Sequence, residues 1–206
     1  MIKSSDKVAG TAAYYQNNAK AYCDETYALN AAHLYPPFLE LLNQGAHILD
    51  LGCGSGRDSE QFIKAGYKVT PMDGSAEIAA YAEQLLGQKV SVNTFQEMTF
   101  TEEFDGVWAS ASLLHCPRKH IPNVLKRIHS ALKLDGIAYL SFKWGEEDTV
   151  DDRGRAFTNY TLDSLKQELK QCTKFEVLNM WQETTPLRGR EQKWVNALLK
   201  KVCTAR

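Results

Sequence analysis

Apolar and polar positions alternate segment by segment along the chain, and from Ala46 onward short apolar runs are separated by amphipathic stretches. The runs have the length of strands, and they fall at residues 47–51, 68–72, 90–92, 104–109 and 136–142. Strands that alternate with helical segments are typical of a parallel sheet covered by helices. The pattern therefore predicts an α/β fold.

Four segments are expected to form helices. Two are expected ahead of the first strand, over residues 11–22 and 27–42. The clearest helix covers residues 121–132, where apolar side chains recur at i, i+3, i+4 and i+7, and we expect Gly136 to close it. A last helix is expected over residues 161–171, because Thr161 is a good N-cap.

The C-terminal part of the chain predicts a hairpin. Two runs, 175–184 and 193–202, are separated by residues 185–190 and by no helical segment, so they are expected to be antiparallel. The complete prediction is a doubly wound, Rossmann-like sheet of seven strands, mainly parallel with an antiparallel last strand. We expect a single domain over the 206 residues, with an N-terminal helical cap (1–44) and an α/β core (45–206).

Composition excludes several classes of protein. The 24 Lys and Arg residues balance 25 Asp and Glu residues, so no global charge attracts nucleic acid or anionic lipid, and neither partner is expected. No segment approaches the roughly 18 consecutive apolar residues of a membrane helix, so we expect a cytoplasmic protein. The five cysteines are scattered without a C-x-x-C pair, which predicts reduced thiols and no metal site.

Three glycines at alternate positions follow the first strand, in the run Asp50-Leu51-Gly52-Cys53-Gly54-Ser55-Gly56. Glycine is needed where the backbone turns sharply or where a ligand approaches it closely. In an open parallel sheet this loop lies at the carboxyl end of the first strand, where ligands bind at the topological switch point. The loop therefore indicates a ligand site.

The residues around the loop narrow the choice of ligand. A dinucleotide motif would have its third small residue where this chain has Arg57. Asp50 would repel a pyrophosphate but suits an ammonium or sulfonium cation. Asp73 lies 21 residues after Gly52, near the spacing at which an acid binds ribose hydroxyls. Together these residues favour S-adenosylmethionine (SAM).

Over residues 48–143 the chain resembles the class I SAM-dependent methyltransferases. The resemblance rests on the glycine loop, on Asp73 and on residues 104–109 and 132–136. Many members begin the turn after the third strand with an aspartate, where this chain has Thr94. The resemblance implies that the following residues bind the cofactor: Asp50, Gly52, Cys53, Gly54, Gly56, Asp73, Gly74, Phe95, Gln96 and Ser110.

The outer motifs are similar to those of small-molecule methyltransferases, including the tellurite-resistance type. They are Tyr14-Tyr15-x-x-Asn18-Ala19-x-x-Tyr22 and Arg155-x-Phe157-x-x-Tyr160-Thr161. The resemblance implies a small-molecule methyl acceptor and a monomer or weak homodimer.

Candidate catalytic and substrate-positioning residues each have a structural alternative. His115 follows the fourth strand and could accept a proton near pH 7, or it could simply pack there. Tyr14 and Tyr15 could cover the methyl donor with their ring faces, or they could be the buried face of a helix. Arg155, with Arg153, could hold an anionic substrate, although a solvated charge cluster on a loop is commoner.

The sequence therefore predicts a SAM-dependent methyltransferase that acts on a small molecule by direct displacement. Two alternatives stay open at this point. A SAM-binding regulatory protein without turnover would keep every cofactor residue, and an NAD-dependent oxidoreductase would keep Gly52, Gly54 and Asp73.

Overall fold

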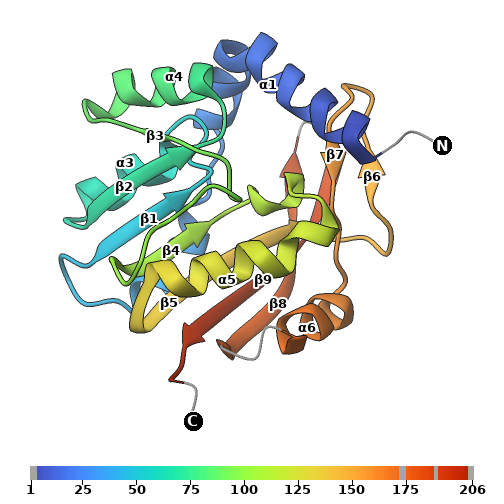
Figure 1. Cartoon of the computed structure of the whole chain (residues 1–206). Coiled ribbons are helices and arrows are strands. Elements are labelled where there is room, and N and C mark those ends of the chain that lie inside the picture. The colour runs from blue at the N-terminus through green and yellow to red at the C-terminus, as the bar shows by residue number, and fades with distance from the viewer. Residues whose placement is uncertain (1–3, 172–174, 188–189, 204–206) are drawn as a thin grey trace.

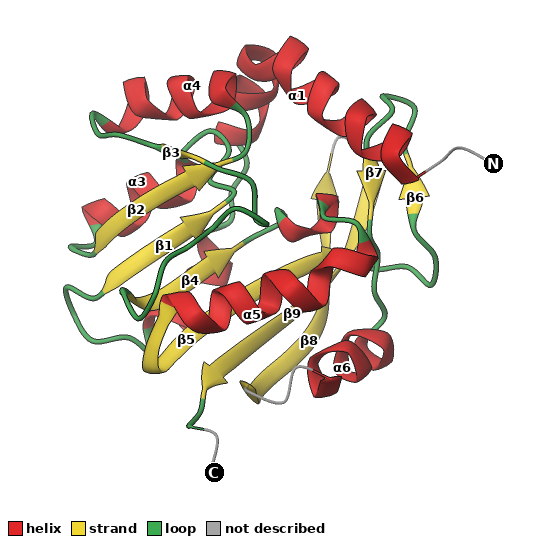
Figure 2. Ribbon diagram, viewed as in Figure 1, coloured by secondary structure: helices red, strands yellow, loops and turns green. Residues whose placement is uncertain are grey.

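The computed structural model describes residues 4–171, 175–187 and 190–203. Within this part of the chain the centre is a seven-stranded sheet in the order β3-β2-β1-β4-β5-β9-β8 (Figures 1 and 2). The strands are β1 (His47–Leu51), β2 (Lys68–Asp73), β3 (Ser91–Val92), β4 (Phe104–Ala109), β5 (Leu132–Lys143), β8 (Phe175–Leu187) and β9 (Arg190–Lys201). The first five strands pair in parallel, and β9 is antiparallel to both of its neighbours. The predicted fold is confirmed.

Helices cover both faces of the sheet (Figure 2). They are α1 (Ser4–Tyr27), α2 (Tyr35–Leu39), α3 (Arg57–Lys64), α4 (Ala76–Leu86), α5 (Ile121–Ala131) and α6 (Leu162–Gln171), with 3-10 turns η1 (Ala32–Leu34), η2 (Leu113–His115) and η3 (Arg118–His120). Apolar residues of α5 and α6 share one core cluster with the sheet, and Phe38 of α2 and Phe62 of α3 share another with the opposite face. Two short strands outside the sheet, β6 (Thr149–Val150) and β7 (Ala156–Phe157), form a separate hairpin.

The N-terminal segment differs from the prediction. The first helix is longer than expected, from Ser4 to Tyr27, and has a kink at Asn18. The helix predicted over 27–42 is wrong, because the chain there forms only η1 and the five-residue α2. Pro36 and Pro37 are the physical reason: proline lacks the backbone N–H and disfavours helix in the residue before it, so both fit only at the start of a new helix.

Two other boundaries are also corrected. Helix α5 ends at Ala131 and not near Gly136, and Asp135 instead takes the left-handed conformation, with φ of 64°. Gly136 is required for close packing, since a Cβ there would lie 2.9 Å from the Lys133 carbonyl oxygen. The loop predicted over 185–190 is too long, because β8 continues to Leu187.

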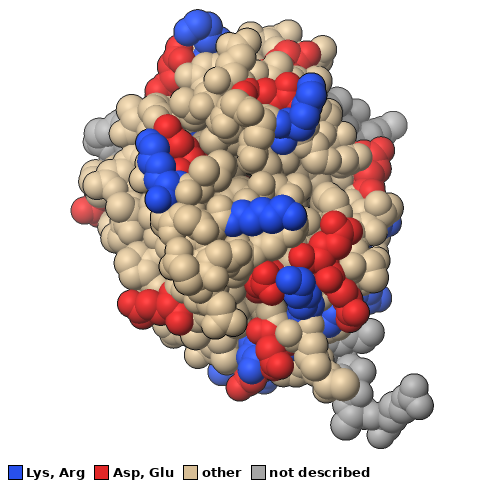
Figure 3. Space-filling model, turned by 90° about the vertical axis from the view of Figure 1, so that its left-hand side faces the viewer, with Lys and Arg blue, Asp and Glu red and all other residues tan. Residues whose placement is uncertain are grey.

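Charge is mixed on the surface where the structure shows it. On the face formed by the left-hand side of Figure 1, basic and acidic side chains are interspersed (Figure 3). In the described part of the chain, no helix has the length and apolarity to cross a membrane. Three of the cysteines, Cys23, Cys53 and Cys116, are buried thiols, and Cys172 lies outside the described residues.

Candidate functional site

The glycine loop joins β1 to α3 at the carboxyl edge of the sheet. Gly52, Gly54 and Gly56 all have positive φ, at 82°, 54° and 81°. A Cβ on Gly52 would lie 2.4 Å from the Cβ of Ser112, so no side chain fits there even apart from the backbone conformation. The N–H groups of Gly52 and Cys53 both donate to the Met72 carbonyl at 2.8 and 2.9 Å, which fastens the loop to the end of β2.

Asp73, the last residue of β2, holds the same loop from its side chain. One carboxylate oxygen accepts from Gly54 N–H at 3.0 Å and the other from Ser75 N–H at 2.9 Å. Burial raises the pKa of this carboxyl, although these N–H donors lower it. Each oxygen keeps a further lone pair, so the carboxylate can still accept from hydroxyl groups of a ligand.

Asp50 places a second carboxyl under the loop and is only 2% exposed. The Ser59 hydroxyl donates to it at 2.6 Å. Burial raises the pKa of Asp50 to about 7, and the neighbouring Asp58 carboxylate acts in the same direction. A cation next to Asp50 would relieve this cost, because it stabilises the ionised form.

Asp58 is held by three donors, which explains why a second buried acid is tolerated nearby. The hydroxyl of Tyr35 and the Nε of Arg57 donate to it at 2.7 Å, and the indole N–H of Trp108 donates at 2.8 Å. In the sequence, Arg57 argues against a dinucleotide-binding motif. In the structure its guanidinium pairs with Asp58 in the first turn of α3.

A cavity of about 540 Å³ opens in front of the loop. Several of the residues singled out from the sequence line it: Tyr15, Asp50, Gly52, Cys53, Gly54, Ser110, His115 and Arg155. The others do not line it: Tyr14, Gly56, Asp73, Gly74, Phe95 and Gln96. The cavity therefore joins the predicted methionine end of the cofactor site to the predicted acceptor residues, while the ribose and adenine residues lie outside it.

The proposed adenine turn follows β3. The ring of Phe95 lies beside the loop, with Cε1 3.6 Å from the place of a Cβ on Gly52. The Gln96 amide lies 3.7 Å from the Cys116 sulfur. Phe95 thus adjoins the glycine loop, whereas the Gln96 side chain already has a partner on the segment after η2.

Helix α1 covers the cavity with aromatic rings. It crosses the carboxyl edge of the sheet (Figure 1), and Tyr15 and Tyr22 line the cavity with ring centroids 4.9 Å apart. Tyr14 packs edge to face on Tyr15 but lies behind it. Burial raises the pKa of Tyr15 to about 12, so its phenol stays protonated in the neutral range.

The Tyr15 hydroxyl lies 2.6 Å from Nε2 of His115, and this contact defines the state of the imidazole. Nδ1 of His115 lies 2.8 Å from the Ala156 carbonyl oxygen, which can only accept, so Nδ1 carries the hydrogen. Nε2 is then the acceptor for the Tyr15 hydroxyl. Burial, together with the nearby charges of Arg155 and Lys143, lowers the pKa of His115 to about 4.

Arg155 lies on the β6–β7 hairpin and is only 9% exposed, so it is not a solvated loop charge. Its Nε and Nη2 donate to Asp151 at 2.9 and 2.7 Å, and its guanidinium carbon lies 4.8 Å from the Tyr14 ring centre. Arg153 is exposed and reaches the Tyr14 hydroxyl. Of the two arginines, only Arg155 faces the cavity.

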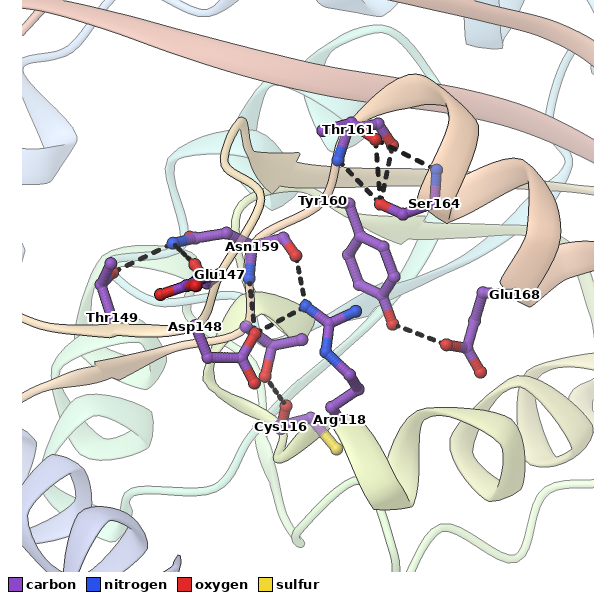
Figure 4. Close-up of polar contacts among 11 residues, drawn as sticks. Cys116, Arg118, Glu147, Asp148, Thr149, Asn159, Tyr160, Thr161, Ser164 and Glu168 are labelled. Carbon is purple, nitrogen blue, oxygen red and sulfur yellow. Dashed lines mark hydrogen bonds and ion pairs between the residues drawn. The ribbon is translucent and has the colours of Figure 1, made fainter. Parts of the chain in front are cut away.

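Arg118 fastens the base of this hairpin (Figure 4). Its Nη2 contacts Asp148 at 2.6 Å and the Asn159 carbonyl, and its guanidinium lies 4.4 Å from the Tyr160 ring centre. The Asn159 amide bonds back to the Glu147 carbonyl at 2.9 Å. These contacts hold the segment that carries Arg155 against the rest of the protein.

Sequence reasoning missed one wall of the cavity, formed by the face of β5, β9 and β8. It includes Tyr139, Ser141, Lys143, Glu183, Trp194 and Asn196. The signal was present in the sequence, because Ser141 and Asn196 interrupt apolar strands, and a polar residue within such a run is the informative exception. In the structure these two residues are register partners and both are buried.

The geometry fits SAM on the chemistry of its donors and acceptors. A buried carboxyl with raised pKa suits the cationic amino-acid end, a glycine loop leaves room for close approach, and Asp73 retains acceptor capacity for hydroxyl groups. A pyrophosphate suits this arrangement poorly, because the Asp50 carboxylate beside the loop would repel it.

Comparisons with known proteins agree with this site. A methyltransferase-domain family model matches residues 48–136. The ubiquinone biosynthesis O-methyltransferase of Glaesserella parasuis is 28% identical over 62% of this chain, and the match spans 61% of that relative. The ubiquinone biosynthesis O-methyltransferase of Actinobacillus pleuropneumoniae serotype 7 is 26% identical over 87% of this chain, and the match spans 84% of that relative.

Solved structures share the fold. The 1,6-didemethyltoxoflavin-N1-methyltransferase of Burkholderia thailandensis, with bound S-adenosylhomocysteine, has a TM-score of 0.79 at 20% identity, covering 98% of this chain and 92% of its own. TehB from Haemophilus influenzae has a TM-score of 0.67 at 18% identity, covering 91% and 67%. The chain therefore contains a match to a methyltransferase domain over the glycine loop and the strands behind it, and it shares the fold of these SAM-dependent methyltransferases.

Proposed function

We propose that the protein transfers the methyl group of SAM to a small-molecule acceptor bound in the 540 Å³ cavity. The observation that carries the proposal is the continuity of this cavity from Asp50 and the glycine loop to His115 and Arg155. Its volume is in the range of small-molecule sites. The similar ubiquinone biosynthesis O-methyltransferases and the didemethyltoxoflavin methyltransferase are named for small acceptors, which supports the same class here.

The cofactor residues in this proposal are those that the resemblance implies. Asp50 would face the cationic methionine end, and Asp73 would accept from the ribose hydroxyls. The Phe95 turn would adjoin the adenine. When bound, SAM supplies an activated methyl group, and the protein contributes by holding two reactants together away from water, which in favourable systems lowers a barrier by about 7 to 11 kcal/mol.

His115 and Tyr15 fit a positioning role better than proton abstraction. An imidazole with a pKa of about 4 stays neutral and is a weak base near pH 7. Its Nε2 can instead hold a hydroxyl, as it holds that of Tyr15. We therefore place both residues where they orient the acceptor, with Arg155 beside them on the cavity wall and Tyr14 behind them. The proposal includes a single cytoplasmic domain that acts as a monomer or weak homodimer.

Calorimetric titration with SAM, S-adenosylhomocysteine and NAD tests the assignment. Loss of a charge-assisted hydrogen bond in Asp73→Ala should weaken SAM binding by about 10- to 150-fold. Asp163→Ala, at an exposed position in the first turn of α6, is the matched control and should bind normally. Binding of NAD without SAM, or equal SAM affinity in both variants, would overturn the proposal. SAM binding without formation of S-adenosylhomocysteine across a screen of small acceptors would indicate the regulatory alternative.

A further inference from the structure

Asn196 is a cavity-lining residue whose side chain has an unused hydrogen-bond donor. The side chain is fully buried in β9 and lines the cavity wall. Its Oδ1 accepts from the Tyr139 hydroxyl at 2.8 Å, whereas its Nδ2 has no partner among the described residues. A buried amide group without a partner is costly, so such a donor usually meets a ligand or an ordered water.

A chain of hydrogen bonds fixes the orientation of this amide. The Ala111 N–H donates to the Ser141 hydroxyl at 2.7 Å, which leaves the Ser141 hydrogen for Tyr139. Tyr139 then donates its own hydrogen to Oδ1 of Asn196. Because each member donates to the next, the chain ends in the two N–H groups of Nδ2.

The residues around Asn196 indicate which chemical groups its ligand would carry. Trp194 lies two residues along β9 on the same face, and its indole N–H is already used by Thr185 at 2.8 Å, so the ring offers an apolar surface. Lys143, the register partner of Trp194, brings a positive charge to the same wall. The acid on this wall, Glu183, is within 3.3 Å of His33.

We propose that Asn196 is a specificity-determining residue that donates to a carbonyl or carboxylate oxygen of the methyl acceptor, a planar molecule that packs against Trp194. This inference rests on the proposed function, because it names the substrate class of the same cavity. A molecule that offers only donors at this point would leave Nδ2 without a partner and is selected against.

The first test observes the amide directly. In ¹⁵N-labelled wild-type protein saturated with S-adenosylhomocysteine, the Asn196 side-chain NH₂ signals are followed while benzoate, benzamide or benzylamine is added. Benzoate and benzamide carry the oxygen and should shift these signals saturably, and the stronger of the two distinguishes a carboxylate from a carbonyl preference. Benzylamine, which is a cationic donor, should leave them in place. An equal response to benzylamine, or no response to either oxygen compound, overturns the inference.

The second test changes the donor alone. Asn196→Asp keeps the acceptor for Tyr139 and replaces the NH₂ by oxygen, so benzoate binding should weaken about tenfold or more. Asn179→Asp makes the same change at an exposed position of β8 and should bind benzoate like the wild type. Equal benzoate binding in both variants overturns the inference. If Asn196→Asp does not fold, the inference is tested by the response of the Asn196 NH₂ signals in the wild-type protein.

The two proposals fail separately. A protein that binds SAM and shows no benzoate response at Asn196 refutes only the acceptor class. A protein that binds no SAM refutes the proposed methyltransferase function, and a benzoate response of its cofactor-free form then assigns the Asn196 donor to a ligand other than a methyl acceptor.

Discussion

Binding of SAM should release a proton from Asp50. In the free protein burial raises the pKa of this carboxyl to about 7, and a cation placed beside it would restore ionisation. If the bound carboxyl is fully ionised, about half a proton leaves at pH 7 and about 0.9 at pH 6. The same linkage makes the dissociation constant of SAM fall by about tenfold between pH 6 and pH 8.

Calorimetry in buffers of different ionisation enthalpy measures this proton release, because the observed heat varies linearly with the buffer enthalpy. Asp50→Asn is the control, since the amide cannot ionise but its oxygen can still accept from Ser59. The variant should bind SAM more weakly and lose the dependence on buffer between pH 6 and 7. A wild-type protein that binds SAM with no proton release at pH 6 would refute the argument that Asp50 is protonated there.

The same carboxyl should lower the folding stability of the cofactor-free protein as pH rises, whereas it should strengthen SAM binding as pH rises. A folded pKa raised above the unfolded value of about 4 means that the cost of burying the charge is absent below pH 4 and complete above pH 7. From a pKa of about 7, this cost is at most roughly 4 kcal/mol. Asp50→Asn should therefore raise the melting temperature of the cofactor-free protein at pH 8 and change it little at pH 4. A lower melting temperature at pH 8 would contradict this.

Three further predictions concern the loop, the imidazole and the hairpin. Gly52→Ala should lower the free energy of unfolding by more than about 2 kcal/mol, because it adds a clash to a strained φ. Gly87→Ala, at positive φ in open space, is the control and should lower it by about 1 kcal/mol. Chemical denaturation measures both free energies. The His115 imidazole should titrate near pH 4 in an NMR titration. Because the unfolded chain takes up this proton near pH 6.5, folding stability should be lost as pH falls from about 6.5 toward 4. A titration midpoint near 6.5 would disprove the burial of His115. Arg118→Met should speed hydrogen exchange in residues 144–160 about tenfold while SAM affinity stays within a factor of two.

The sheet could be predicted because its information is local. Each strand from 47 to 142 is a short apolar run between amphipathic segments, and this periodicity survives in the structure with shifts of a few residues. The N-terminal error arose where two signals conflicted. Apolar spacing over 27–42 favoured one helix, whereas Pro36 and Pro37 interrupted it, and the missing backbone donors prevailed.

The sequence also predicted that Asp50, the glycines and Asp73 meet at one edge of the sheet, because they lie next to strand ends whose neighbours are set by the parallel order; their role in binding the cofactor stays a prediction. The wall of the cavity formed by β5 and β9 could not be predicted from the sequence. The two strands are far apart in sequence, and only their antiparallel register brings Ser141 opposite Asn196. The residues were visible as polar exceptions, but the pairing that turns them into one surface is a tertiary property.

Two buried groups line the cavity, an acid at Asp50 and an amide donor at Asn196, and they favour ligands of opposite kind. The pKa of Asp50 is raised although Arg57 lies nearby, and Nδ2 of Asn196 has no partner among the described residues. A cationic cofactor at the first and an oxygen-bearing acceptor at the second would each remove a cost that the free protein carries. If either ligand turned around, a cation would face the Asn196 donor or an oxygen would face Asp50. The free protein thus favours a cation beside Asp50 and an oxygen-bearing group beside Asn196, and the order of affinities for charged and oxygen-bearing ligands follows from this difference.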